Sequence, residues 1–363
     1  MSNKLKPLII GGTEIEIPIV QGGMGVQVST ASLASAVANC GGAGTIASVG
    51  LGFGTEENEV DFVKASREGL QRQMRRAREL TKGVIGVNVL VALSNYEDLV
   101  RTAISEKADF IVSGAGLPLR LPEFAEGKST KLIPIVSSGR AANIIIKSWR
   151  KRYNRTPDAF VVEGPLAGGP LGFSFEDLES PRKNPLEDLL KDVLEAVNGY
   201  EKDLGVNIPV IAAGGIFDGR DIAKFFKIGA KGVQIATRFV ATFECDVSDK
   251  FKQLYIAAKE SDIVIIKSPV GMPGRALKTK LVEEVEHGRR ESIKCNYRCL
   301  KTCNPSAAPY CIAHALHNAI LGDIDNAVVF AGSNVSRVDK IVSVKELMDD
   351  IVSEAIEELD KII

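Results

Sequence analysis

Eight short apolar runs, spaced along the first two thirds of the chain, limit the folds that this sequence can adopt. Each run is rich in valine, isoleucine or alanine and has glycine, serine or asparagine within it or within two residues of its end. The runs are continuous rather than alternating, as expected for parallel strands that are buried on both faces. They comprise residues 17–20, 44–48, 84–90, 110–113, 132–137, 159–163, 209–213 and 232–237.

Segments with helical periodicity separate these runs. Ser29 or Thr30 and Asp218 are candidate N-caps, and Gly41 and Gly229 stand where helices would end. The weakest connection follows the fourth run, where a short segment carries two prolines. The expected helices comprise residues 30–39, 58–80, 96–106, 142–153, 186–204 and 219–228.

Strands that alternate with helices indicate a parallel sheet, and eight strands is the number that closes a TIM barrel. An open, doubly wound sheet is the alternative. The alternation stops after Phe239. We therefore expect an α/β fold with a TIM barrel in residues 1–244, and a smaller appended lid lobe with a C-terminal helical region in residues 245–363.

Charge and cysteine content exclude several classes of protein. Lysine and arginine number 45 against 46 aspartates and glutamates, so nothing indicates binding to nucleic acid or to an anionic membrane surface. No uncharged apolar run reaches about 18 residues, and no signal-peptide core is visible, so we expect no membrane span and a cytoplasmic location. The six cysteines are expected to be reduced thiols.

Glycines gather directly after the strands, where TIM barrels bind their ligands. Gly214 and Gly215 after the seventh strand, and Ala236 and Thr237 after the eighth, offer unhindered backbone N–H groups. A helix that opens near Asp218 adds a positive dipole, so these positions predict a phosphate site. The alternative is that the glycines only form turns. Further glycines after the strands are Gly22, Gly23, Gly25, Gly114, Gly116, Gly164, Gly168 and Gly169.

A phosphate site in a barrel favours flavin mononucleotide (FMN) as the cofactor. No G-x-G-x-x-G motif stands at a first strand–helix turn, so a Rossmann site for nicotinamide is not expected. Polar side chains at the strand ends could aim hydrogen bonds at the isoalloxazine ring. For Asn88 and Gln234 the alternative is hydrogen bonding to neighbouring backbone. The candidates are Asn88, Ser113, Ser137, Glu163 and Gln234.

Five motifs, in the same order, resemble those of the nitronate monooxygenases, formerly 2-nitropropane dioxygenases, and of the related enoyl-ACP reductase II enzymes. The resemblance covers nearly the whole chain and implies a TIM barrel, non-covalently bound FMN and a lid over the flavin. It does not decide between the two chemistries. The motifs are Gln21-Gly22-Gly23-Met24-Gly25, Gly86-Val87-Asn88, Glu163-Gly164-Pro165-Leu166-Ala167-Gly168-Gly169, Ala212-Ala213-Gly214-Gly215-Ile216 and Gly232-Val233-Gln234-Ile235-Ala236-Thr237-Arg238-Phe239.

The resemblance implies a set of cofactor-binding residues. Those expected near the flavin ring and ribityl chain are Gly22, Gly23, Met24, Asn88, Ser137, Glu163, Gly168, Gly169 and Gln234. Those expected at the phosphate are Gly214, Gly215, Ala236 and Thr237, and Ala213 beside them is also expected to bind the cofactor. Ser333, with Asn334, falls where the tail of the family returns to the flavin.

One position departs from the family pattern. The family carries its catalytic histidine in the motif A-G-G-H-x-G, whereas residues 167–172 here are A-G-G-P-L-G, with Pro170 at the histidine position. Proline cannot take up or release a proton. Either the substrate is already an anionic nitronate, or another group such as Glu163, His314, His317 or a further residue of the tail lobe acts instead, or the reaction needs little acid–base help. No catalytic residue is assigned.

The expected function is that of an FMN-dependent oxidoreductase, with nitronate oxidation by dioxygen as the closest family activity. One alternative is an NAD(P)H-dependent reductase of an enoyl-ACP or a quinone. Another is a flavin-binding electron-transfer protein that lost turnover with the histidine. The expected partners are a small-molecule substrate and dioxygen or a nicotinamide nucleotide, and a homodimer is left open.

Two features of the second region carry chemistry of their own. Cys295, Cys299, Cys303 and Cys311 could hold an iron–sulfur cluster or zinc, but their spacing matches neither standard pattern. We therefore interpret them as small buried hydrophobes and predict no metal ligand. Arg275, in a turn-rich segment that resembles the lid of the family, is a candidate to meet an acidic substrate or a nicotinamide phosphate.

Overall fold

Eight parallel strands close into a barrel in the computed structural model, which describes residues 5–57, 61–180, 184–295 and 297–361. Each strand pairs in parallel with two neighbours, and the eighth strand closes on the first. The predicted TIM barrel is confirmed, and the open sheet is excluded. The barrel strands are β3 (Ile19–Gln21), β4 (Ala43–Ala47), β5 (Val84–Leu90), β6 (Phe110–Gly114), β7 (Lys131–Val136), β8 (Phe160–Glu163), β10 (Val210–Ala213) and β11 (Gly232–Ile235).

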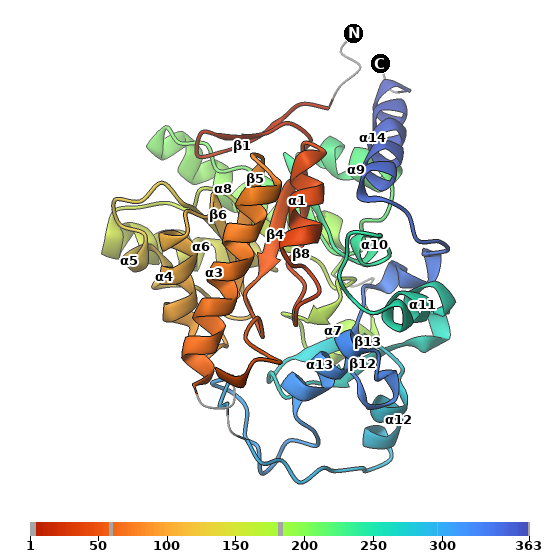
Figure 1. Ribbon diagram of the computed structural model, residues 1–363. Helices are drawn as coiled ribbons and strands as arrows, with labels where there is room; N and C mark the ends of the chain where they lie inside the picture. Colours follow the sequence, from red (N-terminus) through yellow and green to blue (C-terminus); the bar gives the residue numbers. More distant parts are fainter. Residues whose placement is uncertain (1–4, 58–60, 181–183, 296, 362–363) are drawn as a thin grey trace.

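Helices cover the outside of the barrel (Figure 1). Every expected helix is present, although residues 58–60 of the second one lie outside the described residues. Asp218 caps its helix as predicted, in a reciprocal capping box with Asp221. Thr30 stands at the N-cap of α1 without capping it, because its hydroxyl bonds Asp246. These helices are α1 (Ala31–Asn39), α3 (Phe62–Leu80), α4 (Tyr96–Ser105), α5 (Leu121–Phe124), α6 (Gly139–Tyr153), α8 (Leu186–Leu204) and α9 (Gly219–Ile228).

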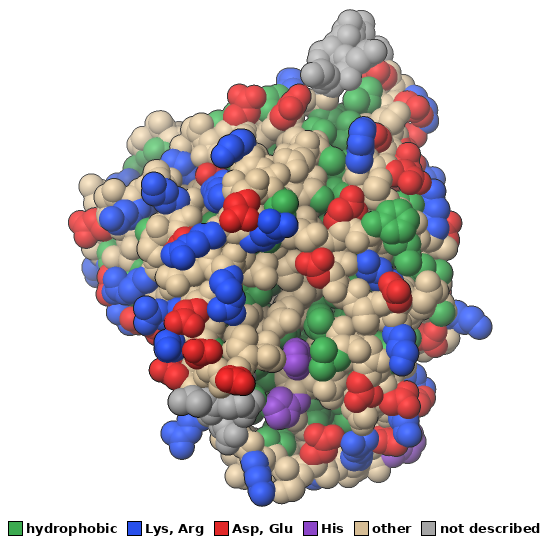
Figure 2. All heavy atoms as spheres, in the orientation of Figure 1, with side chains coloured by type: hydrophobic (Ala, Val, Ile, Leu, Met, Phe, Trp, Pro, Cys, Tyr) green, Lys and Arg blue, Asp and Glu red, His purple; other side chains and the backbone are tan. Residues whose placement is uncertain are grey.

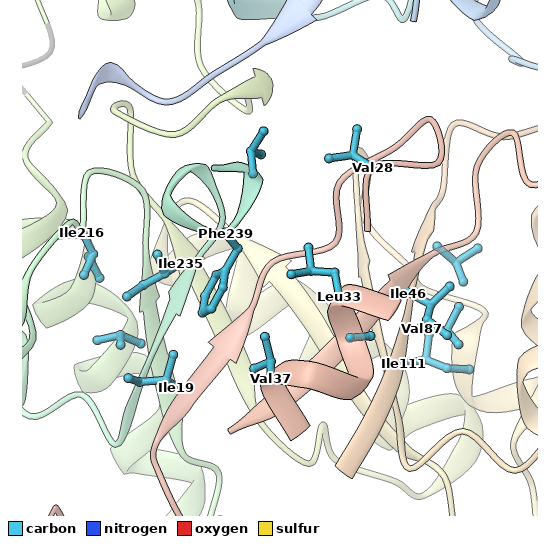
Figure 3. Close-up of a cluster of buried hydrophobic side chains, with 14 of the residues drawn as sticks. Ile19, Val28, Leu33, Val37, Ile46, Val87, Ile111, Ile216, Ile235 and Phe239 are labelled. Atoms are coloured by element: carbon cyan, nitrogen blue, oxygen red, sulfur yellow. The ribbon is translucent and has the colours of Figure 1, made fainter. Parts of the chain in front are cut away.

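The larger part of the core lies between the strands and their helices. Figure 3 shows Leu33 and Val37 of α1 among buried side chains of the strands, which include Ile19, Ile46 and Val87. All five side chains are shielded from solvent. Because the strands are covered on this face and filled on the other, their sequences are apolar without alternation.

A smaller core fills the inside of the barrel. It contains Phe110 and Val161 from the strands, together with Leu8 and Ile15 from a hairpin that precedes the barrel. The hairpin comprises β1 (Leu8–Ile10) and β2 (Thr13–Ile15), which pair antiparallel. It covers the end of the barrel opposite to the carboxyl ends of the strands (Figure 1).

A second sheet lies beyond the carboxyl ends of the barrel strands (Figure 1). Its strand β13 pairs antiparallel with β12 and β14, and also with β9, a two-residue strand that follows β8 of the barrel. Strand β9 is thus a segment that leaves the barrel and joins the separate sheet of the lid by hydrogen bonds. The elements of this region are β9 (Gly169–Pro170), α10 (Thr237–Val240), α11 (Asp249–Ala257), β12 (Ile263–Lys267), β13 (Pro273–Leu277), α12 (Lys280–Glu286), α13 (Ile312–Leu321) and β14 (Val329–Phe330).

The last helix returns from the lid to the barrel. Helix α14 (Val344–Asp360) packs against α9 and α1 (Figure 1). Leu347, Ile351 and Ala355 are buried in this contact, and Glu354 accepts the backbone N–H of Gly219 at 2.9 Å. The C-terminal helical region therefore stabilises the barrel rather than the lid.

The surface agrees with the balanced composition. Figure 2 shows acidic and basic side chains interspersed over the visible face of the molecule. Such a mixture gives no extended field of one sign, as the charge balance predicts. Among the described residues, no helix is long and apolar enough to cross a membrane.

The contact between α9 and α14 can be tested at a glycine. A Cβ on Gly219 would lie 2.2 Å from the backbone nitrogen of Ala355, so Gly219→Ala must displace α14. We expect this variant to lower the free energy of unfolding by about 1–3 kcal/mol. Gly199 in α8 is the matched control, because a Cβ there would meet no atom within 4 Å. In urea unfolding, Gly199→Ala should leave the free energy of unfolding unchanged or raise it by up to about 1 kcal/mol. An equal loss of unfolding free energy in both variants would contradict the close contact between α9 and α14.

Candidate active site

A cavity opens where the carboxyl ends of the barrel strands meet the lid. All but two of the predicted cofactor-binding residues line it, and they come from β3, β5, β8, β10 and β11 near their carboxyl ends or from the segments that follow them. Positions far apart in the sequence thus face one space. The lining residues that were predicted are Gly22, Gly23, Met24, Asn88, Glu163, Gly168, Gly169, Ala213, Gly214, Gly215, Gln234, Ala236 and Thr237.

One end of the cavity is a cradle of bare backbone after β10. Gly214 and Gly215 have φ of +91° and +86°, which glycine adopts at little cost. A Cβ on Gly214 would lie 2.9 Å from the carbonyl oxygen of Gly164. Beside them, the hydroxyl of Thr237 accepts the backbone N–H of Gly332 at 3.1 Å. Backbone amides of this kind, with a hydroxyl close by, suit an anionic group such as a phosphate.

The tail of the chain, at Ser333 and Asn334, lies against this cradle. The side-chain amide of Asn334 donates to the carbonyl oxygen of Gly215 at 2.6 Å. The backbone N–H of Ser333 donates to the carbonyl oxygen of Leu166 at 3.1 Å. The Ser333 hydroxyl does not line the cavity, but it is buried without a hydrogen-bond partner among the described residues. A buried unpaired hydroxyl is unfavourable, so an oxygen-rich ligand beside it would satisfy it.

The wall next to the cradle is also bare backbone. A Cβ on Gly23 would lie 2.3 Å from the Cβ of Asn88, and one on Gly22 would lie 3.2 Å from the Cβ of Ala236. The loop after β3 therefore passes between the neighbouring strand ends only because it lacks side chains. Gly169, at φ +78°, faces open space, since a Cβ there would meet no atom within 4 Å. A planar ring can lie against such a surface.

Arg275 holds the turn that carries Gly168 and Gly169. Its side chain is 4% exposed, and its Nη1 donates to the carbonyl oxygens of Pro165 at 2.5 Å and Ala167 at 2.7 Å. Burial lowers the pKa of Arg275 to about 10, so the guanidinium stays charged at neutral pH. The sequence makes Arg275 a candidate substrate-binding residue, but these contacts show that it joins the lid to the barrel. Nothing in the local sequence indicates this role.

Glu163 brings a titratable group into the cavity wall. It is the last residue of β8, and no hydrogen bond or ion pair joins its carboxyl group to any other described residue. Burial alone raises the pKa of Glu163 to about 7. Near neutral pH the group is therefore present in both protonation states, as a general acid or base requires.

Pro170 also lines the cavity, at the position of the family histidine. It is held in β9 opposite Gly274 of β13. His314 and His317 lie on α13 and are not among the described residues that line the cavity. The ring of His317 instead packs against Phe53, with centroids 5.8 Å apart. Of the three groups considered as replacements for the histidine, Glu163 is the one in the cavity wall.

Sequence reasoning placed two serines differently and missed part of the wall. Ser113 is not among the described lining residues, and its buried hydroxyl donates to the carbonyl oxygen of Val89 at 3.0 Å. Ser137 is also not among the described lining residues, and its hydroxyl donates to the carbonyl oxygen of Gly172 at 3.3 Å. The missed residues form an apolar wall, in part from the lid. The i, i+4 spacing in α13 is the signal that could have found some of them. They include Val28, Phe53, Leu93, Val270, Leu300, Ile312 and Leu316.

These features define a TIM-barrel enzyme whose ligand cavity, at the carboxyl ends of the strands, is closed by an appended lid. The model of the nitronate monooxygenase family matches residues 6–354. The chain belongs to the nitronate monooxygenase family of oxidoreductases.

The proteins that are similar to this chain carry several different names. A protein of Mycobacterium tuberculosis, named as a 5-hydroxy-7a-methyl-1-oxo-octahydro-1H-indene-4-carboxyl-CoA dehydrogenase, is 34% identical over 76% of this chain and 67% of its own. A probable nitronate monooxygenase of Staphylococcus aureus is 30% identical over 75% of this chain and 78% of its own. Among solved structures, FabK from Thermotoga maritima is 30% identical with a TM-score of 0.75, covering 96% of this chain and 95% of that one.

Proposed function

We propose that this chain is an FMN-dependent oxidoreductase that oxidises alkyl nitronates with dioxygen. The observation that carries the proposal is the composition of one cavity. It joins a backbone cradle suited to a phosphate, a wall of bare glycine backbone, and Glu163, whose pKa is raised to about 7 by burial. The matching family model supports the same class of chemistry.

The residues present fit FMN. The bound cofactor would supply two-electron redox chemistry. Bare backbone along the loop after β3 and at Gly169 would lie against its ring, and Asn88 and Gln234 would hydrogen-bond to it. Ser137 is left out of this set, because its hydroxyl faces Gly172. The phosphate would be held by Gly214, Gly215, Ala236, Thr237 and Ser333.

Glu163 would act on the substrate directly. In its protonated form the carboxyl group can donate a hydrogen bond to an oxygen of an anionic nitronate, whereas its ionised form would repel that anion. With a neutral nitroalkane the roles reverse, since only the ionised carboxylate can accept the proton from carbon. The apolar wall that includes Val28, Phe53 and Leu300 would take up the alkyl chain and exclude water.

A second function is the oxidoreduction of an acyl thioester with a nicotinamide nucleotide. Two observations favour it. The Mycobacterium tuberculosis relative is named for a carboxyl-CoA substrate, and the apolar wall extends from the barrel over α13 of the lid, where an acyl chain could lie.

Anaerobic reduction of the bound flavin discriminates between these functions. We expect yellow purified protein whose colour is bleached by an alkyl nitronate and restored by dioxygen, followed by stopped-flow absorbance. Bleaching by NADH or NADPH but not by the nitronate would instead support the thioester function. Bleaching by neither would leave a flavin-binding protein without turnover. Colourless protein that takes up no FMN would contradict all three.

The role of Glu163 predicts opposite pH profiles for two substrates. Because the pKa of Glu163 is about 7, kcat/KM for an anionic nitronate should fall as the pH rises through that value, and kcat/KM for a neutral nitroalkane should rise. Glu163→Gln should flatten both profiles and lower turnover by roughly 10²-fold.

Pro170→His, which adds an imidazole to the same wall, should gain activity with neutral nitroalkanes.

A matched control separates this effect from a general loss of stability. Glu195 is exposed on α8, and Glu195→Gln should keep the wild-type rate and both pH profiles. Unaltered profiles in Glu163→Gln would show that another group titrates, and would remove Glu163 from the mechanism.

A further inference from the structure

The three segments that form the phosphate cradle meet a second time outside the cavity, at the ring of Phe217. They are the loop after β10, the helix α10 after β11, and the 3-10 helix η4 (Ser333–Arg337) of the tail. Arg238 and Arg337 each place a guanidinium group over this ring, with Cζ 4.3 Å and 4.0 Å from its centroid. Neither arginine is among the described residues that line the cavity. None of the roles proposed for the cavity uses this cluster.

Both arginines also hydrogen-bond to the loop after β10 or to the start of α9, which follows it. Nη1 of Arg238 donates to the carbonyl oxygen of Phe217 at 3.0 Å, so it ties α10 to the loop. Nη2 of Arg337 donates to a carboxylate oxygen of Asp218 at 2.7 Å, so it ties the tail to the same place. Hydrogen bonds with a charged donor are stronger than those between neutral groups. The two contacts therefore fix the loop against both of its neighbours.

The same segments carry the groups expected at the phosphate. In the sequence, Gly215 stands two residues before Phe217, and Thr237 stands next to Arg238. On the cavity side, the hydrogen bond from the Asn334 amide to Gly215 joins the tail to the loop. Outside the cavity, the two arginines join these segments again. Loss of either arginine would therefore loosen the backbone N–H groups that a phosphate needs, because a preorganised site depends on such supporting contacts.

The cluster also places two positive charges close to each other. Burial, and then the charge of Arg337, lower the pKa of Arg238. Three carboxylates act in the opposite direction with smaller effects, and they are Asp339, Asp218 and Asp350. Both guanidinium groups stay charged at neutral pH. Like charges that are partly shielded from water repel each other, so an anion in the neighbouring cradle would offset this repulsion.

We propose that Arg238 and Arg337 are positioning residues that make the cradle select a phosphorylated flavin over riboflavin. The inference rests on the proposed binding of FMN and deepens it. Riboflavin would lie against the same glycine wall but would leave the cradle without an anion. Only FMN would gain from the positive charge and from the fixed backbone that the two arginines supply. Both side chains contact the loop rather than the cofactor, so neither is a catalytic residue.

Titration of the flavin-free protein with FMN and, separately, with riboflavin tests the proposal through the quenching of flavin fluorescence. We expect Arg337→Ala and Arg238→Ala each to weaken FMN binding by about tenfold or more, and to leave riboflavin binding within about twofold of the wild type. Arg337→Lys keeps the charge but loses the planar guanidinium group. Its preference for FMN should therefore lie between those of the wild type and Arg337→Ala.

Arg220 supplies a matched control. It donates to Asp218 at 2.8 Å, as Arg337 does, but its second ion pair is with Glu354 of α14 at 3.2 Å. Arg220→Ala should therefore keep the wild-type ratio of the FMN and riboflavin dissociation constants. Circular dichroism is measured on every variant. If Arg238→Ala fails to fold, the more exposed Arg337 supplies the deciding variant.

Several results would overturn the proposal. Equal losses of affinity for FMN and riboflavin in Arg337→Ala would show that this arginine only supports the fold of the cavity. Unchanged FMN affinity in Arg337→Ala, or an equal change of the ratio in Arg220→Ala, would remove the selective role. Wild-type protein that binds FMN no more tightly than riboflavin would exclude selection but leave the proposed cofactor in place. Protein that binds neither flavin would contradict the proposed function itself, and this inference with it.

Discussion

A buried guanidinium group fixes the relation between lid and barrel. Arg275 belongs to the lid sheet, yet its Nη1 satisfies the carbonyl oxygens of Pro165 and Ala167 in the turn after β8. That turn leaves the barrel, so its carbonyls need other partners in a place shielded from water. The backbone of Arg275 also pairs with Gly169. The glycine wall of the cavity and the lid above it are therefore positioned by the same residue.

The position of the lid over the barrel has a direct chemical consequence. With the lid in place, Glu163 at the end of β8 has no charged partner among the described residues, and burial alone raises its pKa to about 7. This chain has proline at position 170 in place of the family histidine, but it keeps a titratable group, Glu163, in the cavity wall. Cys299, from the segment between α12 and α13, also lines the same cavity. The electrostatics of the site depend on the lid as much as on the barrel.

The barrel could be predicted because its signals are local. Continuous apolar runs marked all eight strands, and the glycines after them marked the cavity. Contacts made at long range could not be found in this way, among them the pairing of β9 with β13 and the return of α14. Ser137 was predicted to face the flavin, but its hydroxyl faces Gly172. Arg275 was expected to contact the substrate. Its actual partners, the carbonyl oxygens of Pro165 and Ala167, lie far from it in the sequence, so the residues around Arg275 do not indicate them.

The central claim is that the cradle after β10 holds the phosphate of FMN. Titration of the flavin-free protein with FMN, followed by quenching of flavin fluorescence, tests it most directly. We predict one FMN per chain, affinity at least about 100-fold weaker in Gly214→Val, and wild-type affinity in Gly199→Ala. The reason is that a Cβ on Gly214 would lie 2.9 Å from the carbonyl oxygen of Gly164. No saturable binding by the wild type, or equal affinity in Gly214→Val, would contradict the claim.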